Sequence, residues 1–230
     1  MPVFRLSEAL IFPPAHLARE DGLLGVGGDL SSQRLVLAYQ NGIFPWFSQG
    51  EPLLWWSPDP RMVLYPRNIN ISRSLGKSIR KNQFTITMDH CFNAVITACA
   101  RSRTEQGEGT WLVDGMIPAY TRLHKKGVAH SVEAWRDNEL VGGLYGVSLG
   151  RTFFGESMFS LVSNSSKVAL AALCHHLTAL NFDLIDCQVA TTHLASMGAV
   201  DIPRNLFIQK LASSLTKEPV KGPWSFNGFF

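Results

Sequence analysis

Three strand-like segments follow one another with almost no chain between them, and this feature limits the fold most. Residues 129–136, 139–150 and 151–159 are rich in β-branched and aromatic side chains, and an Asp-Asn pair separates the first two. Connections this short join antiparallel neighbours, whereas parallel strands need a long crossover. The sequence therefore predicts an antiparallel meander.

A long helix and a further strand follow the meander. The helix is predicted over residues 163–181, with Ser163 or Asn164 as its cap, and an apolar strand is predicted over residues 182–190. Strands followed by a helix and another strand are typical of an α+β domain with a mainly antiparallel sheet.

The remaining chain is predicted to hold one more strand and several shorter helices. The strand covers residues 83–88, and Asp89 can cap the helix of residues 90–102 that follows. Ser31 can likewise cap the first helix of the chain. The other helices cover residues 32–41, 71–82, 114–127, 193–198 and 203–211. Residues 1–60 otherwise show little regular pattern, so we expect them to be mostly irregular.

A Ser-Pro-Asp-Pro turn signal marks a boundary near Arg61. The chain has 230 residues, of which 46% are hydrophobic, and this fits one large domain or one domain with a smaller lobe. We therefore expect a small N-terminal lobe over residues 1–61 and a larger domain over residues 62–230.

Basic residues gather in a stretch that has no acid, from Arg61 to Met88. The helix predicted within it places its apolar residues on one side and its basic residues on another, at Arg73, Lys77, Arg80 and Lys81. Such a surface is suited to phosphates, although a basic run is more often a solvated face. The net charge of +3 says little about partners.

The cysteines and the apolar runs indicate a reduced, membrane-free environment. Cys91, Cys99, Cys174 and Cys187 form no Cys-x-x-Cys pair, so we expect free thiols. Residues 1–15 lack the pattern of a signal peptide, and no run of apolar residues is long enough to span a membrane. A cytoplasmic location is therefore expected.

Several chemistries are excluded because their motifs are missing. The sequence has no phosphate-binding P-loop, no Gly-x-Gly-x-x-Gly, no His-Glu-x-x-His and no Gly-x-Ser-x-Gly. His175 and His176 are adjacent and point to different sides of their helix, so we do not expect a metal site there.

The string Leu-Ile-Asp-Cys-Gln of residues 184–188 places polar groups inside an apolar strand. Alternation puts Asp186 and Gln188 on one face and Cys187 on the other. The Asp186–Gln188 pair is either a hydrogen-bonded relay or a structural pair, and spacing alone favours the structural one. Cys187 with His193 could act as nucleophile and base, but a buried apolar role is the better account.

Other candidate features also have two interpretations. Glu156 is either an inward-facing acid or an exposed strand end. The helix start at residues 163–167 offers backbone N–H groups to an anion, or is simply capped. Aromatic side chains could stack on nucleic-acid bases or pack the lobes together, and they are Trp46, Phe47, Trp55, Trp56 and Trp111.

Long ordered strings give the chain a resemblance to a known family. They include GVGGDLSSQRLVLAYQNGIFPWF, LWWSPDPR, GTWLV, ELVGGLYGV, FFGESMFS, LIDCQ and HLASMGA. From about residue 23 to about residue 204, they strongly resemble the bacterial leucyl/phenylalanyl-tRNA–protein transferases. The resemblance implies a small N-terminal lobe and an acetyltransferase-like domain. It also implies transfer of Leu or Phe, and Met less well, from aminoacyl-tRNA to an N-terminal Arg or Lys, which marks a protein for N-end rule degradation.

The resemblance also assigns residues. Catalytic roles fall on Asp186, Gln188 and Glu156, and a platform for the tRNA end falls on Trp46 and Trp111. The implied aminoacyl pocket is lined by Leu144, Phe153, Met158, Leu170, Leu173 and Ile185. We expect a monomer that needs no cofactor and no metal, with the basic helix holding tRNA.

In the expected mechanism, the Gln188 oxygen accepts a hydrogen bond from the attacking amine. Asp186 orients Gln188 and stabilises the charge that develops on the nitrogen. Glu156 pairs with the basic side chain of the acceptor.

Three alternatives remain open at this level. The first is an acyl-CoA-dependent N-acyltransferase that uses the helix start at residues 163–167 for pyrophosphate. The second is a non-catalytic module that binds RNA or peptides. The third is a protease with Cys187 as its nucleophile.

Overall fold

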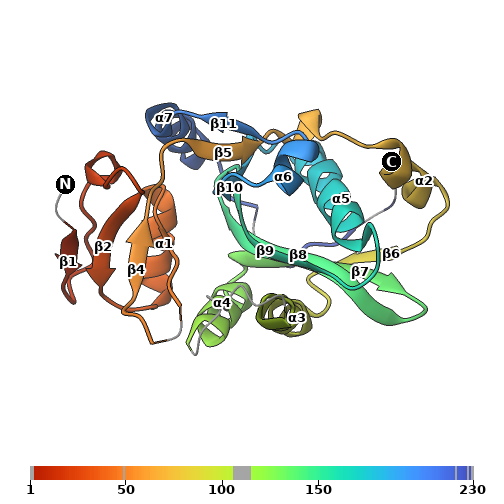
Figure 1. Cartoon of the computed structure of the whole chain (residues 1–230), viewed down its shortest axis with the longest axis horizontal. Coiled ribbons are helices and arrows are strands. Elements are labelled where there is room, and N and C mark those ends of the chain that lie inside the picture. Colours follow the sequence, from red (N-terminus) through yellow and green to blue (C-terminus); the bar gives the residue numbers. More distant parts are fainter. Residues whose placement is uncertain (1–2, 49, 106–114, 221, 227, 229–230) are drawn as a thin grey trace.

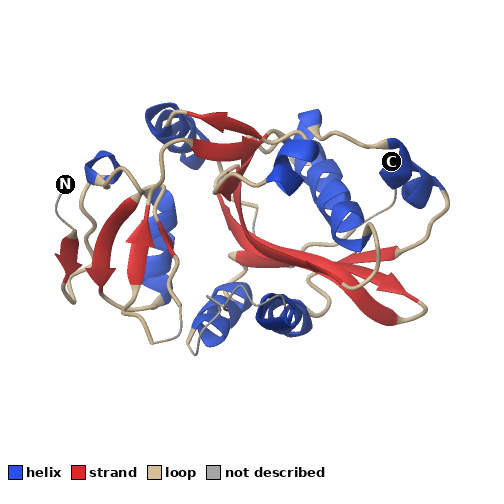
Figure 2. Cartoon of the chain, in the orientation of Figure 1, coloured by secondary structure: helices blue, strands red, loops and turns tan. Residues whose placement is uncertain are grey.

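The computed structural model describes residues 3–48, 50–105, 115–220, 222–226 and 228. Two sheets organise it, one of four strands in the order β1-β2-β4-β3 and one of seven in the order β11-β5-β10-β9-β8-β7-β6. Figure 1 shows the smaller sheet beside the larger one, and Figure 2 shows helices on both faces of the larger sheet. The fold is α+β with a mainly antiparallel sheet, as predicted.

The smaller sheet corrects the expectation that residues 1–60 are mostly irregular. Its strands are β1 (Phe4–Leu6), β2 (Leu23–Gly27), β3 (Phe44–Pro45) and β4 (Leu54–Trp56). They are too short to show an alternating pattern, and backbone pairing between distant segments defines them. Helix α1 (Ser32–Gln40) begins as predicted, because the Ser31 hydroxyl accepts a hydrogen bond from the Arg34 backbone N–H.

The larger sheet contains the predicted meander. Its strands are β5 (Arg61–Leu64), β6 (Thr85–Met88), β7 (Ala129–Arg136), β8 (Glu139–Leu149), β9 (Thr152–Ser160), β10 (Leu184–Gln188) and β11 (Val200–Ile202). Strands β7, β8 and β9 pair antiparallel in sequence order. Strand β10 then runs parallel to β9 and antiparallel to β5, which places β10 inside the sheet.

Helices cover both faces of the larger sheet. They are α2 (Arg73–Arg80), α3 (Phe92–Glu105), α4 (Met116–Lys125), α5 (Ser165–Ala179), α6 (Thr192–Ser196) and α7 (Arg204–Leu215), with short 3₁₀ turns η1 (Ala15–Leu17) and η2 (Pro66–Asn68). Helix α5 packs on one face, and α3 and α4 pack on the other (Figure 1). None of the helices in the described ranges is long and apolar enough to cross a membrane.

Two predicted caps act differently from the expectation. Asn164 precedes α5 in a left-handed conformation, and its side chain donates to Ser74 and Ser78 of α2 instead of capping. Asp89 does not cap α3, which begins at Phe92. Its carboxylate accepts from the Ser131 and Trp224 backbone N–H groups and contacts the His130 ring.

The apolar core has two parts, one on each side of the larger sheet. One part lies between the sheet and α5, and the other lies under α3 and α4. The second part continues into the small lobe, since Tyr39 and Phe44 belong to the same cluster as Tyr145 and Phe207. The change from one sheet to the other falls between β4 and β5.

Candidate active site

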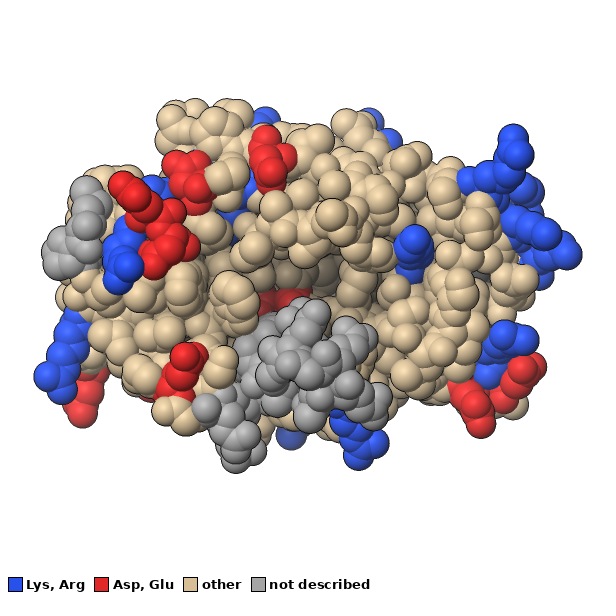
Figure 3. All heavy atoms as spheres, viewed as in Figure 1, with Lys and Arg blue, Asp and Glu red and all other residues tan. Residues whose placement is uncertain are grey.

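A cavity of about 430 Å³ lies where the small lobe meets strands β9 and β10 and helix α5. The small lobe contributes Phe44, Pro45 and Trp46 to its wall. Figure 3 shows a hollow in the middle of one face, with acidic atoms at its floor. Among the described residues that line the cavity, Glu156 is the one carboxylate.

The predicted aminoacyl-pocket residues come together in this cavity. They are Leu144 from β8, Phe153 and Met158 from β9, Leu170 and Leu173 from α5, and Ile185 from β10. Alternation alone does not explain the grouping, because Phe153 and Met158 are five residues apart; a register shift in the pairing of β8 with β9 places both on the α5 side of the sheet. The wall that they form is suited to an apolar side chain.

Glu156 lies at the floor and has only 6% of its surface exposed. Its Oε2 accepts a hydrogen bond from the Tyr120 hydroxyl at 2.9 Å, and its Oε1 accepts one from the Gln188 amide at 2.8 Å. Burial raises the pKa of Glu156 to about 7, although these hydrogen bonds favour the ionised form. The carboxyl therefore changes its charge near neutral pH.

Two tyrosines extend this network into the small lobe. The Tyr39 hydroxyl of α1 is hydrogen-bonded to the Tyr120 hydroxyl of α4, and both side chains are fully buried. Burial raises the pKa of each tyrosine, and the nearby Glu156 adds to the effect. Sequence reasoning missed both residues. The signal was weak, because a tyrosine on the inner face of a helix is usually only a packing residue.

Gln188 reaches Glu156 because the end of β10 departs from regular strand geometry. Its φ is +64°, and the pairing of β10 with β5 shifts register between Asp186 and Gln188. The prediction that Asp186 and Gln188 share a face opposite Cys187 is therefore wrong. Gln188 and Cys187 both line the cavity, while Asp186 lies outside it.

Asp186 is fully buried and held by Arg61. Arg61 Nε and Nη2 donate to the two carboxylate oxygens, each at 2.7 Å, in a bidentate ion pair. Asp186 Oδ1 also accepts the Gln188 backbone N–H at 2.9 Å. This contact offsets the cost of a left-handed non-glycine residue, about 1–2 kcal/mol. Asp186 therefore fixes the Gln188 backbone, whereas Glu156 orients its side chain.

The surroundings of Cys187 do not suit a nucleophile. Burial raises the pKa of its thiol, and the neighbouring Asp186 raises that pKa further. His193 also lines the cavity, and burial lowers its pKa. Across the described ranges, no group of three or more His, Cys, Asp or Glu side chains is arranged to hold a metal ion.

The predicted tRNA platform is described only in part. Trp46 stands at the cavity with 42% of its surface exposed, next to Trp56, whose indole N–H donates to the Trp46 carbonyl oxygen. The two rings lie 5.7 Å apart. Trp111 lies outside the described residues.

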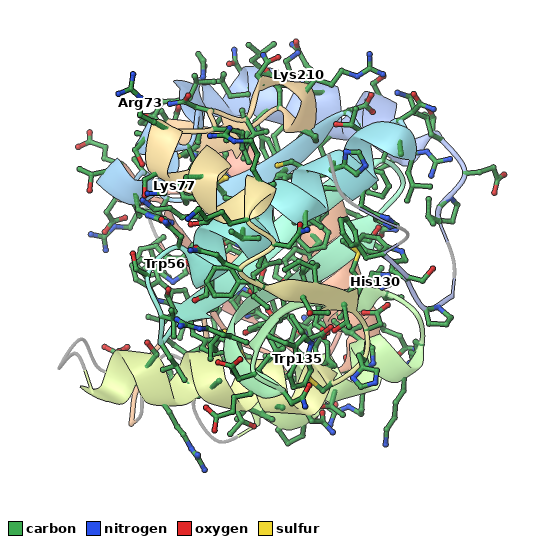
Figure 4. The ribbon with its side chains drawn as sticks, turned by 90° about the vertical axis from the view of Figure 1, so that its right-hand side faces the viewer. Trp56, Arg73, Lys77, His130, Trp135 and Lys210 are labelled. Carbon is green, nitrogen blue, oxygen red and sulfur yellow. The ribbon has the colours of Figure 1, made fainter. Side chains whose placement is uncertain are left out.

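The basic residues of α2 form an exposed surface away from the cavity. Arg73, Lys77 and Arg80 lie on the helix and Lys81 follows it, and all four are exposed. Figure 4 shows Arg73 and Lys77 projecting outward from α2. Arg61, from the same acid-free stretch, does not join this surface, because it is fully buried.

The start of α5 is closed, which argues against a pyrophosphate site there. Ser165 and Ser166 are buried, and the Ser165 hydroxyl donates to backbone carbonyl oxygens. Gly142 of β8 lies so close that a Cβ on it would stand 2.3 Å from the Ser165 oxygen. Tightly packed atoms of the protein itself therefore fill the space at the start of α5.

Comparisons with known proteins give matches that cover most of the chain. The family model for the leucyl/phenylalanyl-tRNA protein transferase matches residues 63–212, and the model for its N-terminal domain matches residues 28–59. A leucyl/phenylalanyl-tRNA–protein transferase of Desulforapulum autotrophicum is 62% identical over 100% of both chains. One from Desulfatibacillum aliphaticivorans is 56% identical over 98% of this chain and 97% of that one.

Among solved structures, similarity is weaker. An aminoglycoside acetyltransferase from an uncultured soil metagenomic sample, in complex with sisomicin, has a TM-score of 0.40 and 13% identity, over 62% of this chain and 95% of that chain. The long, nearly complete matches to the curated relatives determine the assignment. The chain belongs to the leucyl/phenylalanyl-tRNA protein transferase family and is an aminoacyltransferase.

Proposed function

We propose that this enzyme transfers Leu or Phe, and Met less well, from aminoacyl-tRNA to the α-amino group of an N-terminal Arg or Lys. The product is a protein marked for degradation by the N-end rule pathway. One observation carries the proposal beyond the family name. An apolar cavity, suited to the donor side chain, ends at a buried carboxylate, Glu156, that is suited to a basic acceptor.

The reaction is the aminolysis of an ester. The acceptor amine forms a C–N bond with the aminoacyl carbonyl carbon, the C–O bond to the terminal ribose breaks, and the proton that the amine loses ends on the released ribose hydroxyl. The ester is already activated, and a free α-amine with a pKa of about 7.7–8.0 is partly neutral near pH 7. The enzyme therefore needs to position the reactants and accommodate charge more than it needs a strong base.

The contacts suggest a role for each polar group. Gln188 donates its amide N–H to Glu156, which leaves its carbonyl oxygen to accept a hydrogen bond from the amine. Asp186 is already paired with Arg61, so stabilisation of the developing ammonium passes to Glu156. Glu156 also pairs with the guanidinium or ammonium of the acceptor, since each of its oxygens has a second lone pair.

The rest of the molecule has a place in the same proposal. Trp46, with Trp111, stacks on the terminal adenosine, and the basic side chains of α2 hold tRNA phosphates. The lobe of residues 1–61 supplies one wall of the site, and residues 62–230 supply the rest. We propose a cytoplasmic enzyme that acts as a monomer.

A direct transfer assay tests this function. Radiolabelled Leu-tRNA is incubated with peptides that differ only in their first residue, Arg, Lys or Ala. We expect label on the Arg and Lys peptides, and a fall of about tenfold or more in kcat for Gln188→Ala. Val200→Ala, at an exposed site outside the cavity, is the matched control and keeps normal activity. Equal labelling of all three peptides would refute the acceptor assignment.

A further inference from the structure

Arg61 is buried behind the cavity and does not line it. None of its surface is exposed, and its forked guanidinium meets both oxygens of Asp186 at 2.7 Å. Two parallel N–H···O bonds fix the plane of the carboxylate as well as its position. A single ammonium would hold the charge of Asp186 but not its plane.

Two aromatic rings hold the guanidinium from separate parts of the fold. Its central carbon lies 4.8 Å from the Phe44 ring of the small lobe and 4.6 Å from the Phe207 ring of α7. Phe44 also lines the cavity. Arg61 therefore connects the small lobe, the C-terminal helix and strand β10 at one point.

The contacts continue from Asp186 to the reacting end of the site. Asp186 Oδ1 accepts the backbone N–H of Gln188, whose left-handed conformation directs its amide to Glu156. The Asp186 carboxylate is the side chain that holds the Gln188 backbone N–H, so its fixed plane favours this conformation. The series Arg61, Asp186, Gln188 and Glu156 thus runs from the lobe junction to the cavity floor.

Stability alone is a poor explanation for this ion pair. Removing two charges from water is costly, and apolar residues of similar size often stabilise a core as well or better. The bidentate geometry and the second hydrogen bond to Gln188 instead indicate a need for orientation.

We propose that Arg61 is a positioning residue for aminoacyl transfer, acting through Asp186 to hold Gln188 in the conformation that meets the acceptor amine. This inference rests on the proposed function. It assigns to Arg61 no contact with either substrate.

The test uses the full chain and a small set of variants. Arg61→Met removes the forked guanidinium, and Arg61→Lys keeps the positive charge without the fork. Arg61→Met is also combined with Asp186→Asn, and this double variant leaves neither residue as an unpaired buried charge. Arg34→Met is the matched control, because Arg34 is also fully buried and holds Asp29 and backbone carbonyls far from the cavity. Circular dichroism gives the folded fraction at the assay temperature.

The kinetic expectation concerns kcat per folded molecule. Arg61→Met lowers kcat about tenfold or more, and Arg61→Lys about threefold or more, while both KM values stay within about threefold of wild type. Arg34→Met loses stability but keeps kcat. In the Asp186→Asn background, Arg61→Met changes kcat by less than about twofold, because the partner through which it acts is already altered. If Arg61→Met does not fold, Arg61→Lys and the double variant decide.

A second readout does not depend on activity. Hydrogen exchange of the segment 184–190 is expected to be faster in Arg61→Met and Arg61→Lys than in wild type and in Arg34→Met at equal global stability. The proposal is overturned if folded Arg61 variants keep kcat within about twofold of wild type, if their cost is the same in both backgrounds, or if exchange in this segment is unchanged. If the wild-type protein transfers neither Leu nor Phe, the proposed function fails, and the exchange result still decides whether Arg61 positions Gln188.

Discussion

At the residue scale, Glu156 sets the pH dependence that this site can have. Burial raises its pKa to about 7, so the carboxylate that would meet a basic acceptor forms only as the pH rises through neutrality. An ordinary exposed glutamate would be ionised throughout this range. The Glu156 carboxyl therefore titrates in the same pH range in which the acceptor amine begins to lose its proton.

Replacing Glu156 with Gln tests this titration. For wild type, kcat/KM for an Arg-starting peptide is expected to rise through two ionisations, one near pH 7 from Glu156 and one near pH 8 from the amine. Glu156→Gln keeps only the upper one and loses about tenfold or more of the preference for Arg over Ala. The measurement is a pH profile of kcat/KM for both peptides. A variant with both ionisations and an unchanged preference for Arg would contradict the assignment.

At the element scale, two strand irregularities bring the polar groups of the site together, one at Glu156 of β9 and one at the end of β10. The last residues of β10 shift register, and this shift turns Gln188 into the cavity while Asp186 stays behind the sheet. A regular strand would have left both on the side away from the cavity. Bulges of this kind next to active sites commonly redirect one side chain.

Helix α2 is the element expected to contact tRNA. Changing Lys77, Arg80 and Lys81 to Glu should weaken tRNA binding about tenfold or more and flatten its salt dependence, because phosphate contacts release counterions. The dissociation constant is measured at several salt concentrations. A matched set of reversals at exposed Lys125, Lys126 and Arg136 controls for net charge. Equal losses in both sets would mean that α2 has no special role.

At the scale of the whole molecule, the two sheets share one core. Apolar side chains of the small lobe, such as Tyr39 and Phe44, belong to the cluster that contains Tyr145 and Phe207. The Arg61 guanidinium, which is paired with Asp186 inside the larger sheet, also packs on the Phe44 ring of the small lobe, and breaking a buried pair of this kind typically costs about 3–5 kcal/mol. Neither sheet can therefore lose its structure without exposing core of the other.

This shared core predicts a single unfolding transition. Scanning calorimetry of the full chain is expected to show one peak, with a calorimetric enthalpy equal to the van't Hoff enthalpy. Tyr39→Ala, which removes a buried contact on the lobe side, should shift the whole peak to a lower temperature. Two separate peaks, of which only one moves in the variant, would show independent domains.

The sequence by itself determined the elements whose patterns are local. The meander of β7 to β9 and the helices α1, α2 and α5 follow from alternation and helical spacing, which neighbouring residues set, whereas the residues of the apolar cavity wall came from the family resemblance. The family strings also identified Glu156, Asp186 and Gln188 as the residues to examine. The small sheet was missed, because its strands are too short to carry a pattern and depend on pairing with distant segments.

Only the tertiary structure decided how the polar groups of the site work together. The partner of Asp186 is Arg61, 125 residues away in the chain, and from the sequence Arg61 was only the first basic residue of an acid-free stretch. Glu156 accepts a hydrogen bond from Tyr120, which lies 36 residues away on α4. A pKa near 7 and a left-handed Gln188 result from burial and from contacts between such distant segments, and no local pattern encodes them.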